Sequence, residues 1–201
     1  MYSLPANTLI NQPLYKKTVF EKFNLKTAER ERFDADISKM ALVARVSSAT
    51  VPALTKWKEI EGFYVLQVAM KRKDYDSKNI LMLQKLIPQK LIFALQFEEQ
   101  TQFCIFHTRL QQSAWMPTDE ATITLQGLSL DDVWNNIVAT IGGLDAMAEA
   151  SIEEQIIQRE QREKLLRQIE ALEKRARTEK QTRKKYELHQ EIMKLKKELA
   201  E

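Results

Sequence analysis

Two clusters of basic side chains are the residues whose type and spacing point most directly to chemistry. The first is the run Lys71, Arg72 and Lys73. The second contains a single acid, Glu179, and its seven basic residues are Lys174, Arg175, Arg177, Lys180, Arg183, Lys184 and Lys185. Clustered cations attract phosphate groups without reading a base sequence. A solvated helix surface explains the same pattern, so contact with nucleic acid, contact with a protein partner and a plain surface are all retained as interpretations.

A metal-dependent nuclease is the enzymatic hypothesis that the sequence raises. Such an enzyme places an acid on one strand and an acid-x-lysine on the next, so that two carboxylates hold Mg²⁺. Lys71 supplies the lysine, but the position two residues before it is Ala69, and Gln67 lies two further back. Without a pair of carboxylates the ion has no site, and a divergent Mg²⁺ nuclease is kept only as an alternative.

The remaining reactive side chains form no catalytic or metal-binding pattern. His107 and His189 are far apart, and no cysteine or carboxylate accompanies either at metal-ligand spacing. The common phosphate-loop, zinc-protease and nucleophile-elbow motifs do not occur in the sequence. Cys104 lies in the apolar run FCIF and is predicted to be a buried thiol. We therefore predict no catalytic residue, no metal site and no cofactor.

The stretch from Phe63 to Leu110 must supply the core that positions these groups, because it holds most of the large apolar side chains. Its patterns predict a buried strand, a helix capped by Ser77, and a β-hairpin. These elements span Phe63–Met70, Ser77–Ile87, Leu91–Phe97 and Thr101–Thr108. The side chains predicted to be buried are Val65, Leu66, Val68, Leu81, Ile92, Phe93, Leu95 and Phe106.

The flanking segments complete a mixed domain. Residues 1–26 are interpreted as an extended arm with one short helix, Leu14–Phe23, and residues 111–120 as a loop. We further expect two helices, the first capped by Thr27 and the second by Ser129, and two more strands. In chain order these elements are Lys26–Met40 (helix), Ala41–Val46 (strand), Ala121–Leu125 (edge strand) and Leu130–Ile141 (helix, ended by Gly142 and Gly143). The predicted fold class is α+β, with a mixed sheet and flanking helices.

Residues 144–201 differ in character from the rest of the chain. All five prolines and all four glycines lie at or before Gly143, and the residues that follow are rich in Glu, Lys, Arg, Gln and Leu. That composition is typical of long helices. Residues 151–201 carry 14 basic and 11 acidic residues, so residues 1–150 carry 17 of each and are neutral. We predict a domain over residues 1–143 and a charged helical tail over residues 144–201.

Apolar residues of the tail form two rows at helical spacing, and two arrangements of them are open. The gap of 12 positions between Ala176 and Leu188 fits no heptad register. Either one helix continues as a coiled coil with a rotated seam, or the chain turns near Thr178–Thr182 and forms a helical hairpin. The rows are Leu165, Ile169, Leu172 and Ala176, then Leu188, Ile192, Leu195 and Leu199.

Composition also bounds the cellular setting. The chain has one cysteine, so no disulfide can form within it, and a reducing compartment is expected. The N-terminal residues lack the pattern of a secretory signal, and no run of about 18 apolar residues predicts a membrane span. We expect a cytoplasmic protein.

Several stretches together resemble a bacterial domain family of unknown function, the one numbered four-three-nine-one. They are LYKKTVFEKFNL, ERERFDADI, YVLQVAMKRKDYDSKNI, LIPQKLIFALQF, LQGLSLDDVWNNIV and the tail segment REKLLRQIEALEKRARTEKQ. The resemblance covers nearly the whole chain and brings no assigned activity. Its implied gene setting is beside DNA methyltransferases and superfamily-two helicases similar to type III restriction systems.

The leading hypothesis is therefore a non-enzymatic accessory protein of a bacterial DNA-modifying or phage-defence system. By resemblance, its protein partner would be a helicase or a methyltransferase, with non-specific nucleic-acid contact as a further expectation. The alternatives are the divergent Mg²⁺ nuclease and a structural protein that self-associates into a homo-oligomer through its tail.

Overall fold

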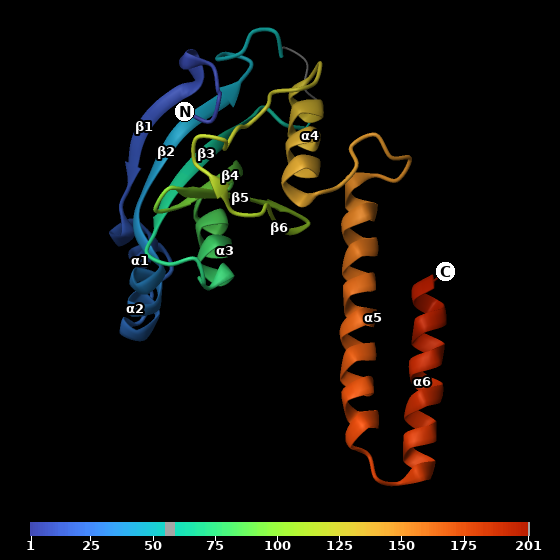
Figure 1. Ribbon diagram of the computed structural model, residues 1–201. Coiled ribbons are helices and arrows are strands. Elements are labelled where there is room, and N and C mark those ends of the chain that lie inside the picture. Colours follow the sequence, from blue (N-terminus) through green and yellow to red (C-terminus); the bar gives the residue numbers. More distant parts are fainter. Residues whose placement is uncertain (55–58, 201) are drawn as a thin grey trace. The chain divides into compact units, whose positions relative to one another are not determined.

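A mixed β-sheet organises the N-terminal part of the protein in the computed structural model, which describes residues 1–54 and 59–200 (Figure 1). Its strands lie side by side in the order in which they occur in the chain, and every neighbouring pair is antiparallel except β3 and β4. They are β1 (Leu9–Leu14), β2 (Ile37–Ser47), β3 (Gly62–Met70), β4 (Lys90–Phe97), β5 (Gln100–His107) and β6 (Arg109–Gln112), with the short β7 (Met116–Pro117) beside β5.

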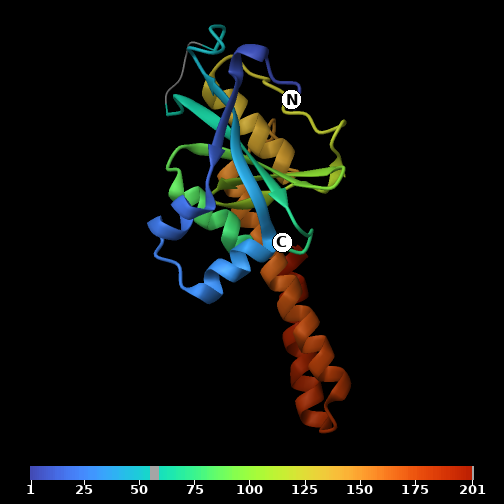
Figure 2. The same ribbon diagram turned by 90° about the vertical axis from the view of Figure 1, so that its left-hand side faces the viewer.

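Helices cover both faces of this sheet (Figures 1 and 2). On one face α1 (Lys16–Lys22), α2 (Thr27–Asp36) and α3 (Ser77–Leu86) share a core with side chains such as Leu66 and Val68 of β3. On the other face lies α4 (Leu130–Gly142), whose Trp134 ring is 5.7 Å from that of Phe63. Since α3 carries the chain from β3 back to the start of β4, these two strands can run parallel. The α+β class with a mixed sheet and flanking helices is confirmed.

The helix predicted over Lys26–Met40 was too long, because α2 ends at Asp36 and β2 begins at Ile37. Ile37 and Met40 are three residues apart and both buried, which is the spacing of a helix face. The strand register shifts between Ile37 and Lys39, however, so the irregular strand also turns both side chains to the same side. Three-residue spacing therefore could not distinguish this bulged strand from a helix.

Three other predicted segments differ from the structure, although the short helix predicted over Leu14–Phe23 is present as α1. The N-terminal arm contains β1, which pairs with β2. Residues 121–125 form no strand, and Ile123 N donates a hydrogen bond of 2.9 Å to Tyr2 O. The predicted loop 111–120 holds the end of β6 and all of β7. These strands are short or contain proline, so their sequences carry little alternating pattern.

Helix caps and burial were partly predicted. Ser129 caps α4 as expected, since its hydroxyl accepts from Asp132 N at 3.1 Å. The cap of α3 is Asp76 and not Ser77, because the Asp76 carboxylate accepts from Lys78 N at 2.9 Å. Thr27 is the first residue of α2, whose N-cap is Lys26. Among the predicted core residues, Leu81 is only partly buried and Phe106 is 39% exposed.

The chain divides into two compact units, Met1–Ile152 and the C-terminal Glu153–Glu201. The C-terminal part contains α5 (Ile152–Thr178) and α6 (Thr182–Ala200), whereas residues 144–151 are turns and not helix. The two predicted apolar rows meet as a helical hairpin, with a core of Ile169, Ala176, Ile192 and partly buried leucines. Among the described residues, no helix is long and apolar enough to cross a membrane.

Leu95 tests the position of the sheet core, because it is fully buried in β4 between β3 and β5. We expect Leu95→Ala to lower the free energy of unfolding by about 2–5 kcal/mol, since a large cavity would remain. Chemical denaturation followed by tryptophan fluorescence measures the change. Leu128→Ala is the control, because Leu128 is 88% exposed and should change stability by less than about 0.5 kcal/mol. Equal losses in the two variants would contradict this description of the core.

Candidate functional site: a basic helical hairpin

Arg72, a member of the first basic cluster, has a structural role, because it pairs with a buried carboxylate. Its Nε and Nη2 atoms both lie 2.6 Å from Oδ1 of Asp36, whose side chain is 1% exposed. The other carboxylate oxygen of Asp36 accepts from Asp76 N at 2.9 Å and from Asn79 Nδ2 at 2.8 Å. In addition, Lys71 N donates to the main-chain oxygen of Asp36 at 2.7 Å. The guanidinium therefore neutralises a buried carboxylate and is poorly placed to bind a ligand as well.

Lys73 is also engaged within the body. Its ammonium lies over two aromatic rings, 6.0 Å from the centroid of Phe97 and 5.8 Å from that of Trp115, and it donates a hydrogen bond to Gln100. Cation–π contacts of this kind fix a lysine against its own protein. Lys71 is exposed, and its side chain has no partner among the described residues. The sequence cluster at positions 71–73 thus yields a single unengaged cation in the structure.

The second basic cluster surrounds the turn between α5 and α6. All seven side chains are exposed, and they come from the last turns of α5, from the connection, and from the first turn of α6. Arg183 Nε lies 3.2 Å from Glu187 Oε1, whereas the other six have no ion-pair partner among the described residues. The turn therefore concentrates positive charge at one end of the hairpin. These residues are Lys174, Arg175, Arg177, Lys180, Arg183, Lys184 and Lys185.

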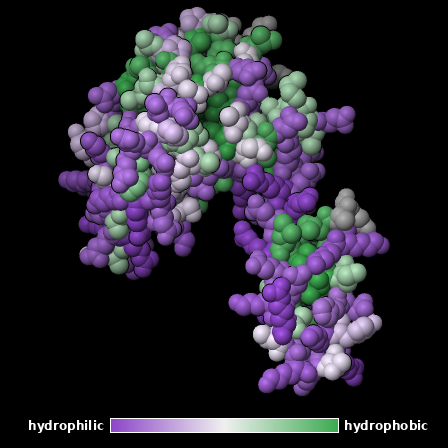
Figure 3. Space-filling model, in the orientation of Figure 1, coloured by the Kyte–Doolittle hydropathy of each residue, from purple (hydrophilic) through white to green (hydrophobic). Residues whose placement is uncertain are grey.

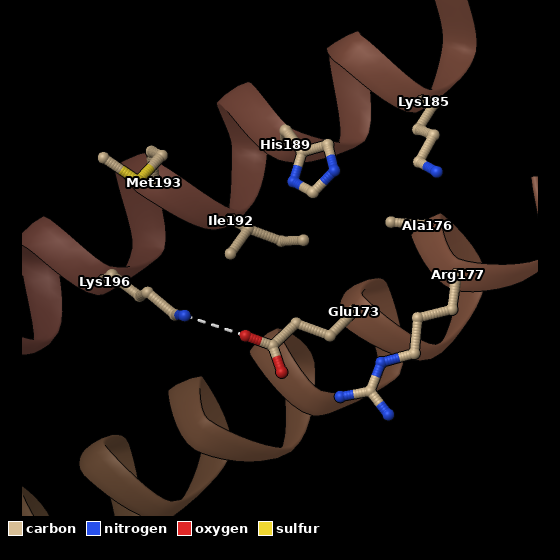
Figure 4. A pocket seen from close by; sticks show the side chains of 8 residues that line it. All are labelled: Glu173, Ala176, Arg177, Lys185, His189, Ile192, Met193 and Lys196. Atoms are coloured by element: carbon tan, nitrogen blue, oxygen red, sulfur yellow. Dashed lines mark hydrogen bonds and ion pairs between the residues drawn. The ribbon is translucent and has the colours of Figure 1, made fainter. Parts of the chain in front are cut away.

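One side of the hairpin is hollow beside this turn (Figure 4). The hollow has a volume of about 410 Å³. Ala176, which is 3% exposed at the seam, is one of the residues that line it. We call this hollow the Ala176 groove. It is lined by Glu173, Ala176 and Arg177 of α5 and by Lys185, His189, Ile192, Met193 and Lys196 of α6.

The single acid in the Ala176 groove is already paired. Lys196 Nζ lies 2.8 Å from Glu173 Oε1 and joins the two helices. This hydrogen bond, the charge of Lys196 and the more distant charge of Arg177 lower the pKa of Glu173 below its ordinary value. Arg177, Lys185 and His189 line the same hollow, and none is within ion-pair distance of a carboxylate among the described residues. The groove therefore combines an apolar floor with unbalanced positive charge.

The opposite side of the hairpin has a different charge. A hollow of about 490 Å³ on that side is lined by Arg175 and Lys184 together with three glutamates, Glu179, Glu187 and Glu191. Positive charge there is balanced by nearby acids. Figure 3 shows an apolar patch on the hairpin that is bordered by hydrophilic residues. The two sides of the hairpin are thus chemically distinct.

Sequence reasoning placed His189 on the surface, which is where it lies, but did not connect it to the basic cluster. Lys185, His189 and Met193 are spaced four residues apart and so share one flank of α6. That spacing was visible in the sequence. What it could not show is that Arg177 and Ala176 of α5 would face this flank, because their placement depends on where the hairpin turns.

A second cavity, of about 800 Å³, lies on the sheet where the nuclease hypothesis would need its carboxylates. Gln67 and Ala69 of β3 line it, and none of its lining residues is Asp, Glu, His or Cys. The amide of Gln67 donates to that of Gln96, which in turn donates to the Tyr2 hydroxyl at 3.1 Å. A chain of neutral hydrogen-bonding groups thus occupies this part of the sheet, and it offers none of the anionic oxygen ligands that Mg²⁺ prefers.

The other reactive side chains serve the core. Cys104 is fully buried, and its burial raises the pKa of the thiol to about 11, which disfavours the reactive thiolate. Trp134 Nε1 lies 3.5 Å from His107 Nδ1, which places that histidine against α4. Within the described part of the chain, no three His, Cys, Asp or Glu residues are grouped so that they could hold a metal ion.

Fold and site together define an α+β sheet domain joined to a helical hairpin with a basic turn. The chain belongs to the family described as Domain of unknown function (DUF4391), whose model matches residues 3–199. No curated protein and no solved structure matches the chain.

Asp36 provides the test of the role assigned to Arg72. We expect Asp36→Ala to lower the free energy of unfolding by about 3 kcal/mol, because the buried Asn79 amide and the Asp76 N–H would lose their acceptor. Asp34→Ala is a matched control in the same helix, since that carboxylate is 46% exposed and, among the described residues, pairs with Lys16 alone at 2.5 Å. Its loss should cost less than about 1 kcal/mol. Chemical denaturation that shows equal effects would refute the structural role of Asp36.

Proposed function

We propose that the protein is a non-enzymatic interaction protein whose helical hairpin binds an acidic surface of a protein partner. The observation that carries this proposal is the turn between α5 and α6, where seven exposed basic side chains gather and six have no ion-pair partner among the described residues. Such a concentration of charge speeds encounter with an oppositely charged partner and selects against partners of the same sign.

The distribution of charge favours an acidic protein over a nucleic acid. A duplex would meet the glutamates on one side of the hairpin, where Glu179, Glu187 and Glu191 accompany the cations. On the other side the floor of the Ala176 groove is apolar, and phosphate groups gain nothing from contact with Ile192 or Met193. A protein surface can use the charges and the apolar floor together.

The identity of the partner follows from the resemblance and belongs to the proposal. The gene setting implied for the family supports a helicase or a methyltransferase of a bacterial DNA-modifying or defence system. The nuclease alternative is less favoured, because Gln67 and Ala69 line the sheet cavity where a Mg²⁺ nuclease would need carboxylates. A cytoplasmic location is part of the same proposal.

Neutralising the turn should abolish partner capture. We expect the variant Arg175→Gln, Arg177→Gln, Arg183→Gln and Lys184→Gln to lose the protein that the wild type retains from nuclease-treated extract of the native host. Folding should be unchanged, because all four side chains are exposed. Quantitative mass spectrometry of the retained proteins measures the loss.

A matched variant removes the same charge elsewhere on the same helices. Lys164, Arg167, Lys194 and Lys197 are exposed and lie outside the turn cluster, so their replacement by Gln should leave capture intact. A labelled DNA duplex is titrated with salt beside this experiment. If wild type binds the duplex at physiological salt, with log affinity falling by about 0.9 per phosphate contact against log salt, the turn is a nucleic-acid site instead. Equal capture by both variants would show that the turn is a solvated surface.

A further inference from the structure

The apolar lining of the Ala176 groove indicates what kind of element binds there, which the charge of the turn alone does not. The groove runs between two helices, its floor is made by the small side chain of Ala176 and by Ile192, and Met193 stands beside it with 67% of its surface exposed. A flexible thioether at the edge of a groove adapts its shape to an apolar side chain laid against it. A floor of this kind is suited to the apolar face of another helix.

The cations of the groove are arranged on both of its walls. Arg177 belongs to α5, and Lys185 and His189 belong to α6, so an object lying in the groove would be flanked by positive charge on each side. Figure 4 shows the Lys185 ammonium and the His189 ring directed into the space between the helices. At the end of the groove away from the turn, Lys196 forms an ion pair of 2.8 Å with Glu173, so its charge is already neutralised there.

From these contacts we propose that the Ala176 groove receives an acidic amphipathic helix of the partner protein. This inference rests on the proposed function and specifies the element that is bound. Apolar side chains one helical turn apart would lie over Ala176 and beside Met193, and carboxylates on the flanks of the same helix would meet Arg177 and Lys185. The hollow of about 410 Å³ accommodates a few apolar side chains of such a helix.

Two synthetic peptides of identical composition test this inference. One is an amphipathic helix of about 11 residues, three turns long, with leucines one turn apart and glutamates elsewhere. The other has the same residues in an order that breaks the apolar stripe. Fluorescence anisotropy with the full chain should show the amphipathic peptide binding about tenfold more tightly than the scrambled one.

Variants that keep the fold then locate the binding. Met193→Gln preserves side-chain length and should weaken the amphipathic peptide about fivefold while leaving the scrambled one unchanged. Tyr186→Gln is its control, because Tyr186 is 64% exposed on the same helix and does not line the groove. Lys185→Gln should weaken the amphipathic peptide about threefold, whereas Lys184→Gln, on the other side of the hairpin, should have a smaller effect.

The outcomes separate this inference from the proposed function. If both peptides bind equally and both are lost in the fourfold turn variant, the groove inference is overturned while charge-driven docking stands. If neither peptide binds at low salt, the groove inference fails, and capture from extract then decides the proposed function by itself. A doubled mass in light scattering that Met193→Gln returns to the monomer would assign the groove to a second copy of this chain and overturn the inference. Circular dichroism confirms that each variant is folded.

Discussion

The buried carboxylate of Asp36 is the interaction on which the arrangement of the body depends. It lies at the junction of α2 and β2, and it binds the segment that leaves β3 and the beginning of α3. Asp76 donates its main-chain N–H to Asp36 and caps α3 with its own carboxylate, so one charged group fixes the end of a strand and the start of a helix. The crossover between the two parallel strands, β3 and β4, is anchored at this point, and Arg72 compensates the buried negative charge.

The hairpin relies on a different balance of forces. Its core contains three buried residues and four partly buried leucines, which is little apolar surface for two helices. The Glu173–Lys196 pair adds one link across the seam, but exposed pairs contribute modestly. Ala176 is 3% exposed at the seam, and a hollow lined by Arg177, Lys185 and His189 opens beside it. In line with the proposed function, we interpret the hollow and its cations as a surface that binds a partner. In the body, by contrast, each buried charge is matched internally.

Sequence patterns predicted the elements that bury a continuous apolar face and failed where long-range contacts decide the outcome. The central strand, α3, the β4–β5 hairpin and α4 follow from local periodicity and caps. The bulge that turns Ile37 and Met40 to one side, and the pairing of the proline-containing β1, depend on partners elsewhere in the sheet. For the site, the composition of positions 174–185 showed the charge directly. The sequence could not predict the ion pair of Arg72 with the buried Asp36, because the two residues are distant in sequence. The same holds for the cation–π contacts of Lys73 with Phe97 and Trp115.

The order of the strands has a consequence for how the body assembles. Since each strand pairs with its neighbour in the chain, each step of sheet formation closes a loop much shorter than the chain, and the entropy lost in that closure is correspondingly smaller. The exception is the segment around Tyr2, which contacts Gln96 across 94 positions and packs its ring on Phe103. That contact requires β4 and β5 to be in place. We therefore expect the segment around Tyr2 to pack only after these two strands have paired.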